Sequence, residues 1–152
     1  MHRVPTLFVD ADACPVKEEV VRVAERHSVP VNMVSDGGVR PHPSPLITIT
    51  VVSQGADAAD DWIAERVTPG DIIITNDIPL ADRCIKAGGA VLRPNGEVIT
   101  PASIGMVLAT RNLMTDLRET GTITGGPRPF SKQDRSKFLQ SLEVVVQAAK
   151  RG

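Results

Sequence analysis

Short apolar runs alternate with stretches of helical periodicity along the whole chain, and this alternation limits the choice of fold. Two of these runs, at residues 7–9 and 72–74, contain no polar residue. Uninterrupted apolar strands are typical of parallel sheets that are covered on both faces, because neither face of such a strand meets water. Strands that alternate with helices build such sheets from strand–helix–strand units. We therefore predict a three-layer α/β fold with a mostly parallel central sheet of about five strands.

The expected elements follow from apolar spacing and from the glycines and prolines that end each run. A chain of 152 residues fits one domain, and we predict a single domain over 1–152. Strands are expected at 6–10, 29–35, 46–52, 71–75 and 90–93, with a hairpin turn into a further extended segment at 97–100. Helices are expected at 15–27, 56–67, 77–88, 101–119 and 131–150.

Acidic residues follow the two most apolar strands. Asp10 and Asp12 come directly after the first strand, and Asp77 follows the run at 72–74. Ligands of open α/β sheets bind at the carboxyl ends of the strands, so these acids are candidates for chemistry. Two acids one residue apart converge only if the chain leaves the strand at Asp10. Alternatively, Asp12 is a turn residue, and Asp77 caps the helix that follows it.

A further acid is expected from the helix at 56–67. At about 100° per residue, Asp60 lies about 50° from the centre of the apolar face, Asp57 about 110° and Asp61 about 150°. An acid beside a buried face is costly unless it is paired or bound to a metal, so Asp60 is the favoured helix acid. Asp82, in the next helix, either turns back to the strand ends or is solvated.

These carboxylates favour a hard divalent cation. No cluster of histidine or cysteine accompanies them, so Mg²⁺ or Mn²⁺ is expected rather than zinc. Such ions bind phosphates and activate water, which points to hydrolysis of a phosphoryl group. The predicted catalytic acids are Asp10, Asp12, Asp60 and Asp77, and the predicted metal ligands are Asp10, Asp60, Asp77 and Asp82.

The end of the chain is basic. From Arg111 onward there are eight Lys and Arg residues against four Asp and Glu residues, although the whole chain carries a net charge of −1. A Gly/Pro/Thr loop and the last helix, at about 120–150, hold most of this charge. A phosphate or nucleic-acid surface is one interpretation, and a capped helix with a solvated basic face is the other. The candidate phosphate-binding residues are Arg111, Arg118, Arg128, Lys132 and Arg135.

Composition narrows the cellular location and the kinds of ligand that we expect. The two cysteines, Cys14 and Cys84, are too few for a disulfide framework. The first apolar run is too short for a signal peptide or a membrane span, so we expect no membrane association and a reducing cytoplasmic location. The sequence leaves the oligomeric state open. Only four aromatic residues are present, which disfavours binding of bases by aromatic stacking.

Several motifs together resemble a known family. They are the segments at 10–15 (DADACP), 55–61 (GADAADD) and 74–81 (ITNDIPLA), and the run from Thr124 that continues through Asp134 to Phe138. The chain resembles the YaiI/YqxD family of bacterial proteins, which is similar to PIN-domain-like proteins. That resemblance implies a parallel sheet between helices, an acidic cluster that binds Mg²⁺ or Mn²⁺, and cleavage of RNA.

The same resemblance assigns roles to individual acids. Asp10 would match the acid of the first strand, Asp60 the helix acid, and Asp77 and Asp82 the later acids. Asp12 is an additional acid, and the basic loop and last helix lie outside the minimal PIN pattern.

We therefore expect a metal-dependent, nuclease-like hydrolase that acts on RNA or another phosphodiester. One alternative is a phosphatase of the haloacid-dehalogenase type, with Asp10 as nucleophile and Asp12 as acid, although the later motifs of that superfamily occur here in the wrong order. The other alternative is an RNA-binding module without catalysis.

Overall fold

The computed structural model describes residues 4–53, 55, 57–123 and 129–151, and these residues build one six-stranded sheet. The strand order is β3-β2-β1-β4-β5-β6, with β1 to β5 parallel and β6 antiparallel to β5. The strands are β1 (Leu7–Asp10), β2 (Val31–Ser35), β3 (Ile47–Val51), β4 (Ile72–Ile74), β5 (Ala90–Leu92) and β6 (Val98–Ile99).

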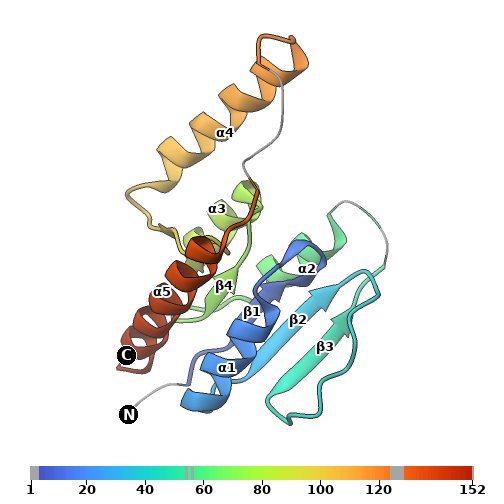
Figure 1. The fold of residues 1–152 in the computed structure, drawn as a ribbon, viewed down its shortest axis with the longest axis vertical. Helices are drawn as coiled ribbons and strands as arrows, with labels where there is room; N and C mark the ends of the chain where they lie inside the picture. The colour runs from blue at the N-terminus through green and yellow to red at the C-terminus, as the bar shows by residue number, and fades with distance from the viewer. Residues whose placement is uncertain (1–3, 54, 56, 124–128, 152) are drawn as a thin grey trace.

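Helices cover both faces of the sheet and make three layers (Figure 1). Helices α1 and α5 pack on one face, and α2 and α3 pack on the other. The helices are α1 (Lys17–His27), α2 (Ala58–Arg66), α3 (Ile78–Lys86), α4 (Ile104–Glu119) and α5 (Lys132–Lys150). The predicted three-layer α/β fold with a mostly parallel sheet is confirmed, and it is roughly consistent with a PIN-like architecture.

Alternation along the central strands explains the two cores. Leu7 and Val9 of β1 face α1 and α5, whereas Phe8 between them faces α2 and α3. In β4, Ile72 and Ile74 pack on the first side and Ile73 on the second. All six side chains are buried, as expected for strands that are covered on both faces.

The sheet has six strands rather than about five because the hairpin turn after β5 continues the pairing. Arg93 N donates to Glu97 O at 2.8 Å, and Gly96 N donates to Arg93 O at 2.9 Å. This turn reverses the chain, so that β6 pairs antiparallel with β5 at the edge of the sheet.

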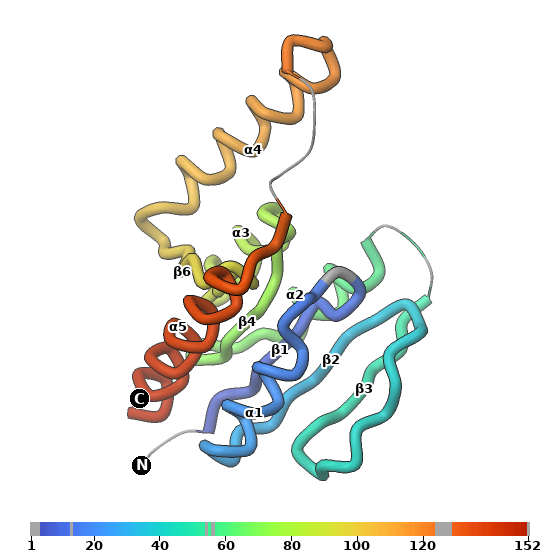
Figure 2. The backbone as a smooth tube through the Cα atoms, in the orientation of Figure 1, coloured from blue at the N-terminus to red at the C-terminus, as the bar shows by residue number. Residues whose placement is uncertain are grey.

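The order in which successive strands are added to the sheet reverses between β1 and β4. From β1 the chain moves through β2 to β3, and it then returns through α2 to β4 on the other side of β1 (Figure 2). In open α/β sheets this reversal point leaves a crevice at the carboxyl ends of the two strands. The acids at the end of β1 and after β4 therefore lie where the topology favours a ligand site.

Helix α4 stands apart from these layers. It makes its main contacts with α3 and extends beyond the body of the molecule (Figure 1). Ile104 is its only buried residue, and Met106 is 77% exposed. No helix within the described residues has the length and apolar character needed to cross a membrane.

Candidate functional site

Asp10 ends β1 and is held at the reversal point by the residue that follows β4. The hydroxyl of Thr75 donates a hydrogen bond to Asp10 Oδ2 at 3.0 Å. Burial raises the pKa of Asp10, and the charges of Asp77 and Asp12 raise it further, while the Thr75 hydrogen bond opposes them. Asp10 is thus a half-buried carboxylate whose ionisation is disfavoured by other carboxylates.

Asp77 is the helix cap of α3 and also a neighbour of Asp10. Its Oδ1 atom accepts a hydrogen bond from Leu80 N at 2.9 Å, as a cap does, and its own backbone N–H donates to Thr75 Oγ1 at 2.9 Å. The capping role proposed as an alternative is therefore real, and it does not separate Asp77 from the other acids. Thr75 joins the two strand-end acids, and we did not single it out from the sequence.

Asp60 brings the third carboxylate, from the first turn of α2. Burial raises the pKa of Asp60 to about 7, together with the charge of Asp77, a hydrogen bond between the two carboxyl groups, and the charges of Asp10 and Asp57. A hydrogen bond between two carboxyl groups requires a proton on one of them. The cluster therefore consists of Asp10, Asp60 and Asp77.

The helical projection separated the acids of α2 correctly. Asp60 is half-buried, whereas Asp61 is exposed and accepts a hydrogen bond from Arg83 at 2.8 Å. Asp57 is exposed and acts on Asp60 through its charge. The sequence signal for Asp60 was its place at the edge of the apolar face, and this held although α2 is shorter than expected.

Asp12 turns toward β2 instead of joining the cluster through hydrogen bonds. Its carboxylate accepts from the Ser35 hydroxyl at 2.5 Å and from Asp36 N at 3.0 Å. Some desolvation opposes ionisation, but these hydrogen bonds outweigh it and lower the pKa of Asp12. A carboxylate held in its charged form is poorly suited to donate a proton, which disfavours the phosphatase alternative.

Asp82 is occupied by a local ion pair. Its Oδ2 atom accepts a hydrogen bond from Lys86 Nζ at 2.8 Å, one turn further along α3. Such an i, i+4 pair is the ordinary arrangement for a partly solvated helix acid. The structure thus brings Asp10, Asp60 and Asp77 together and places Asp82 in a separate contact.

The basic candidates fall into two separate places. Lys132 and Arg135 lie in the first turn of α5, while Arg111 and Arg118 lie on α4. Arg128 lies outside the described residues.

The start of α5 is already satisfied. Ser131 and Asp134 form a reciprocal capping box, and Arg135 Nη1 donates to the buried Glu19 at 2.8 Å. Arg135 also donates to the carbonyl oxygen of Pro15 at 2.9 Å. These contacts support the interpretation of a capped helix that is tied to α1.

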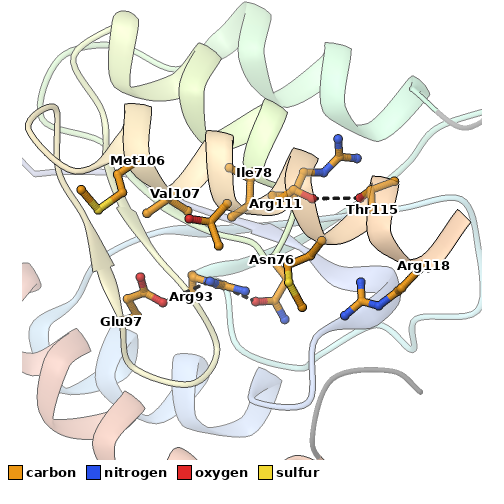
Figure 3. Close-up of a pocket in the computed structure, with 11 residues that line it drawn as sticks. Asn76, Ile78, Arg93, Glu97, Met106, Val107, Arg111, Thr115 and Arg118 are labelled. Atoms are coloured by element: carbon orange, nitrogen blue, oxygen red, sulfur yellow. Dashed lines mark hydrogen bonds and ion pairs between the residues drawn. The ribbon is translucent and has the colours of Figure 1, made fainter. Parts of the chain in front are cut away.

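Arg111 and Arg118 line a groove beneath α4 (Figure 3). Asn76 and Arg93 line the same groove, and Arg93 Nε donates to Asn76 Oδ1 at 3.1 Å. Neither residue carried a sequence signal, because they come close only when β4 and β5 pair. Asn76 directly precedes Asp77 in the sequence, although none of the three acids lines the groove.

The donor chemistry of the cluster fits a hard cation. All three side chains offer carboxylate oxygens, which Mg²⁺ and Mn²⁺ prefer. Asp10 and Asp77 each use one oxygen for an internal hydrogen bond, and this leaves the other oxygen for a ligand. The type of donor fits, but the arrangement does not yet form a ligand set: among the described residues, no three or more His, Cys, Asp or Glu side chains are grouped so that they could hold a metal ion. A cation would therefore have to draw the three carboxylates together.

Comparison with known proteins gives a family and no solved relative. The family model described as "Uncharacterized BCR, YaiI/YqxD family" matches residues 8–148. A UPF0178 protein of Rhodopseudomonas palustris strain TIE-1 is 61% identical over 140 residues, which cover 92% of this chain and 89% of that protein. UPF0178 proteins of Bradyrhizobium diazoefficiens (56% identity, 99% and 91% covered) and Nitrobacter winogradskyi (57%, 95% and 92%) are similar over comparable spans. No solved structure matches the chain.

Proposed function

The chain belongs to the YaiI/YqxD family, and we propose that it is a Mg²⁺- or Mn²⁺-dependent hydrolase of RNA or another phosphodiester. Asp10, Asp60 and Asp77 would hold the cation. The observation that carries this proposal is the mutual effect of these three carboxylates at the reversal point of the sheet, where burial and neighbouring charge raise the pKa of Asp60 to about 7. Strongly shifted acids in a topological crevice are typical of functional sites.

The proposed chemistry divides the work among the residues. A divalent cation held by Asp10, Asp60 and Asp77 would neutralise phosphate charge and would supply an activated water molecule for attack at phosphorus. Asp60 would hold the cation as a carboxylate, so it would have to lose its proton before the cation binds. The Thr75 hydroxyl positions both acids: it donates a hydrogen bond to the Asp10 carboxylate and accepts one from the backbone N–H of Asp77.

Hydrolysis of a generic phosphodiester tests this proposal. With bis(p-nitrophenyl) phosphate and Mn²⁺, we expect turnover by the wild-type protein and a loss of at least about 100-fold in kcat/KM for Asp10→Asn, Asp60→Asn and Asp77→Asn. Asp61→Asn is the matched control, because it changes the neighbouring residue of the same helix and leaves the cluster intact. The proposal fails if the three cluster variants retain the wild-type rate, or if the wild-type protein shows no turnover of this diester or of RNA with either cation.

A second pair of variants tests the role of Thr75. Thr75→Val removes the hydroxyl that serves both acids and should lower kcat, and Thr75→Ser should restore it. If Thr75 only supported the fold, valine and serine would both be tolerated, provided that each variant folds. Equal rates for the two variants would therefore contradict positioning by the hydroxyl.

A further inference from the structure

A groove lies between α4 and the hairpin of β5 and β6, with a volume of about 540 Å³. Its apolar wall comes from Ile78, Met106, Val107 and Met114. Met106 is 77% exposed, so this wall is open to solvent. The volume lies within the range of small-ligand sites, and methionine is an adaptable apolar surface.

The polar side of the groove is cationic. In Figure 3, the side chains of Arg93 and Arg118 extend toward Asn76 from opposite sides. Arg93 is fixed by Asn76 and by Glu97, whose Oε2 atom lies 3.1 Å from Arg93 Nη1. Arg118 is exposed, and its guanidinium group has no hydrogen bond or ion pair within the described part of the chain. The groove therefore combines one fixed guanidinium group with one that is available.

The groove borders the chain segment that carries Asp77. Asn76 and Ile78 both line it, and Asp77 lies between them in the sequence. A chain molecule longer than the groove would have its contacts here one residue away in the sequence from Asp77, a member of the acidic cluster. The inference that follows rests on the proposed function, since it names the substrate class of that site.

We propose that the groove beneath α4 binds a single-stranded nucleic acid. Arginine matches the phosphates in charge and in hydrogen-bonding geometry, and its flat guanidinium group also stacks on bases. The apolar wall offers contact to base faces, and only an unpaired strand exposes those faces. The pairing of cationic and apolar surface thus selects single strands over duplexes, whose bases are covered.

Binding measured without catalysis tests this proposal. A fluorescein-labelled ten-nucleotide RNA of mixed sequence is titrated with protein in EDTA and followed by fluorescence anisotropy. We expect Arg118→Gln to raise Kd about fivefold and to reduce the slope of log K against log salt by about 0.7, the value for one phosphate contact on a single strand. Arg111→Gln, at the rim of the groove, should have a smaller effect in the same direction.

Matched controls separate this groove from general charge. Arg22→Gln removes the same charge from an exposed residue of α1, on the other side of the sheet, and should leave Kd unchanged. Lys132→Gln tests the start of α5 in the same way. DNA of the same sequence shows whether the 2′-hydroxyl contributes, and a ten-base-pair duplex should bind at least about tenfold more weakly than the single strand.

Some results would overturn the proposal. An unchanged Kd for Arg118→Gln would do so, as would equal affinity for the duplex and the single strand. A wild-type protein that binds neither the RNA nor the DNA single strand, and that self-associates through α4, would also overturn it. Failure of the proposed hydrolysis is distinguishable, because binding in EDTA requires neither the cation nor turnover. Binding without turnover would support the proposed binding groove and contradict the proposed hydrolase function.

Discussion

Asp60 is the residue whose chemistry depends most on its neighbours. An isolated aspartate ionises near pH 4, but burial and the carboxylates of Asp77 and Asp10 raise the pKa of Asp60 to about 7. The metal-free cluster is therefore partly protonated at neutral pH, and a cation that binds there must displace a proton.

This competition predicts a pH dependence of metal binding. Below pH 7 the proton on Asp60 opposes the cation, so Mn²⁺ affinity should rise up to about tenfold per pH unit from pH 6 to 7 and level off above pH 7. Calorimetric titrations at pH 6, 7 and 8 check this, and buffers of different ionisation enthalpy report the proton released. Affinity that is constant over this range would show that Asp60 does not compete with a proton.

The same raised pKa affects stability in a direction that can be derived. Between about pH 4 and 7 the folded protein binds more protons at Asp60 than the unfolded chain does, so metal-free stability falls as the pH rises through this range. Asp60→Asn keeps the size of the side chain without the charge. It should flatten this dependence, which serves as the control for the assignment to Asp60.

At the scale of elements, α5 is anchored to α1 by one buried acid. Glu19 is only 5% exposed, and Arg135 provides its partner, with Nη1 at 2.8 Å and 3.1 Å from its two carboxylate oxygens. A buried carboxylate that loses its partner is destabilising, because its charge is left uncompensated. Arg135 is therefore better explained as the residue that fixes α5 than as a phosphate ligand.

We predict that Arg135→Gln lowers the free energy of unfolding by about 2 kcal/mol. This value is smaller than for a fully buried ion pair, because the guanidinium group is partly exposed and solvent weakens the interaction. Urea denaturation at pH 7 measures the change. Lys132→Gln is the control in the same turn of α5, and it should change stability by less than about 0.5 kcal/mol, because Lys132 is exposed. If both variants have wild-type stability but weaker RNA binding, the phosphate interpretation of Arg135 is the correct one.

The elements were also where sequence reasoning was strongest. The apolar runs predicted the parallel strands, and the capping pattern at Ser131 predicted the start of α5, because these signals are local. Strand pairing is not local, so the hairpin strand β6 was not counted within the sheet and Arg93 was not placed beside Asn76. The projection of α4 beyond the body was not predicted either, because its sequence contains enough apolar residues for a packed helix.

For the whole molecule, the sheet topology determines where the candidate site lies. Side-chain contacts determine which acids belong to it. Asp10 and Asp77 could be predicted as neighbours because both follow buried parallel strands. Asp60 could be predicted from its angle on the helix. Asp12 could not be resolved, since its direction depends on where the chain leaves β1 and on the Ser35 hydroxyl that it meets. Thr75 carried no sequence signal, because a threonine is common in any strand.

The central claim is that the cluster of Asp10, Asp60 and Asp77 binds a divalent cation, and titration with Mn²⁺ at pH 8 tests it most directly. We expect saturable binding to the wild-type protein that Asp10→Asn weakens at least about tenfold and that Asp61→Asn leaves unchanged. Circular dichroism confirms that each variant is folded before it is titrated. Equal Mn²⁺ binding by the wild-type protein and Asp10→Asn, or no binding by either, would contradict the claim.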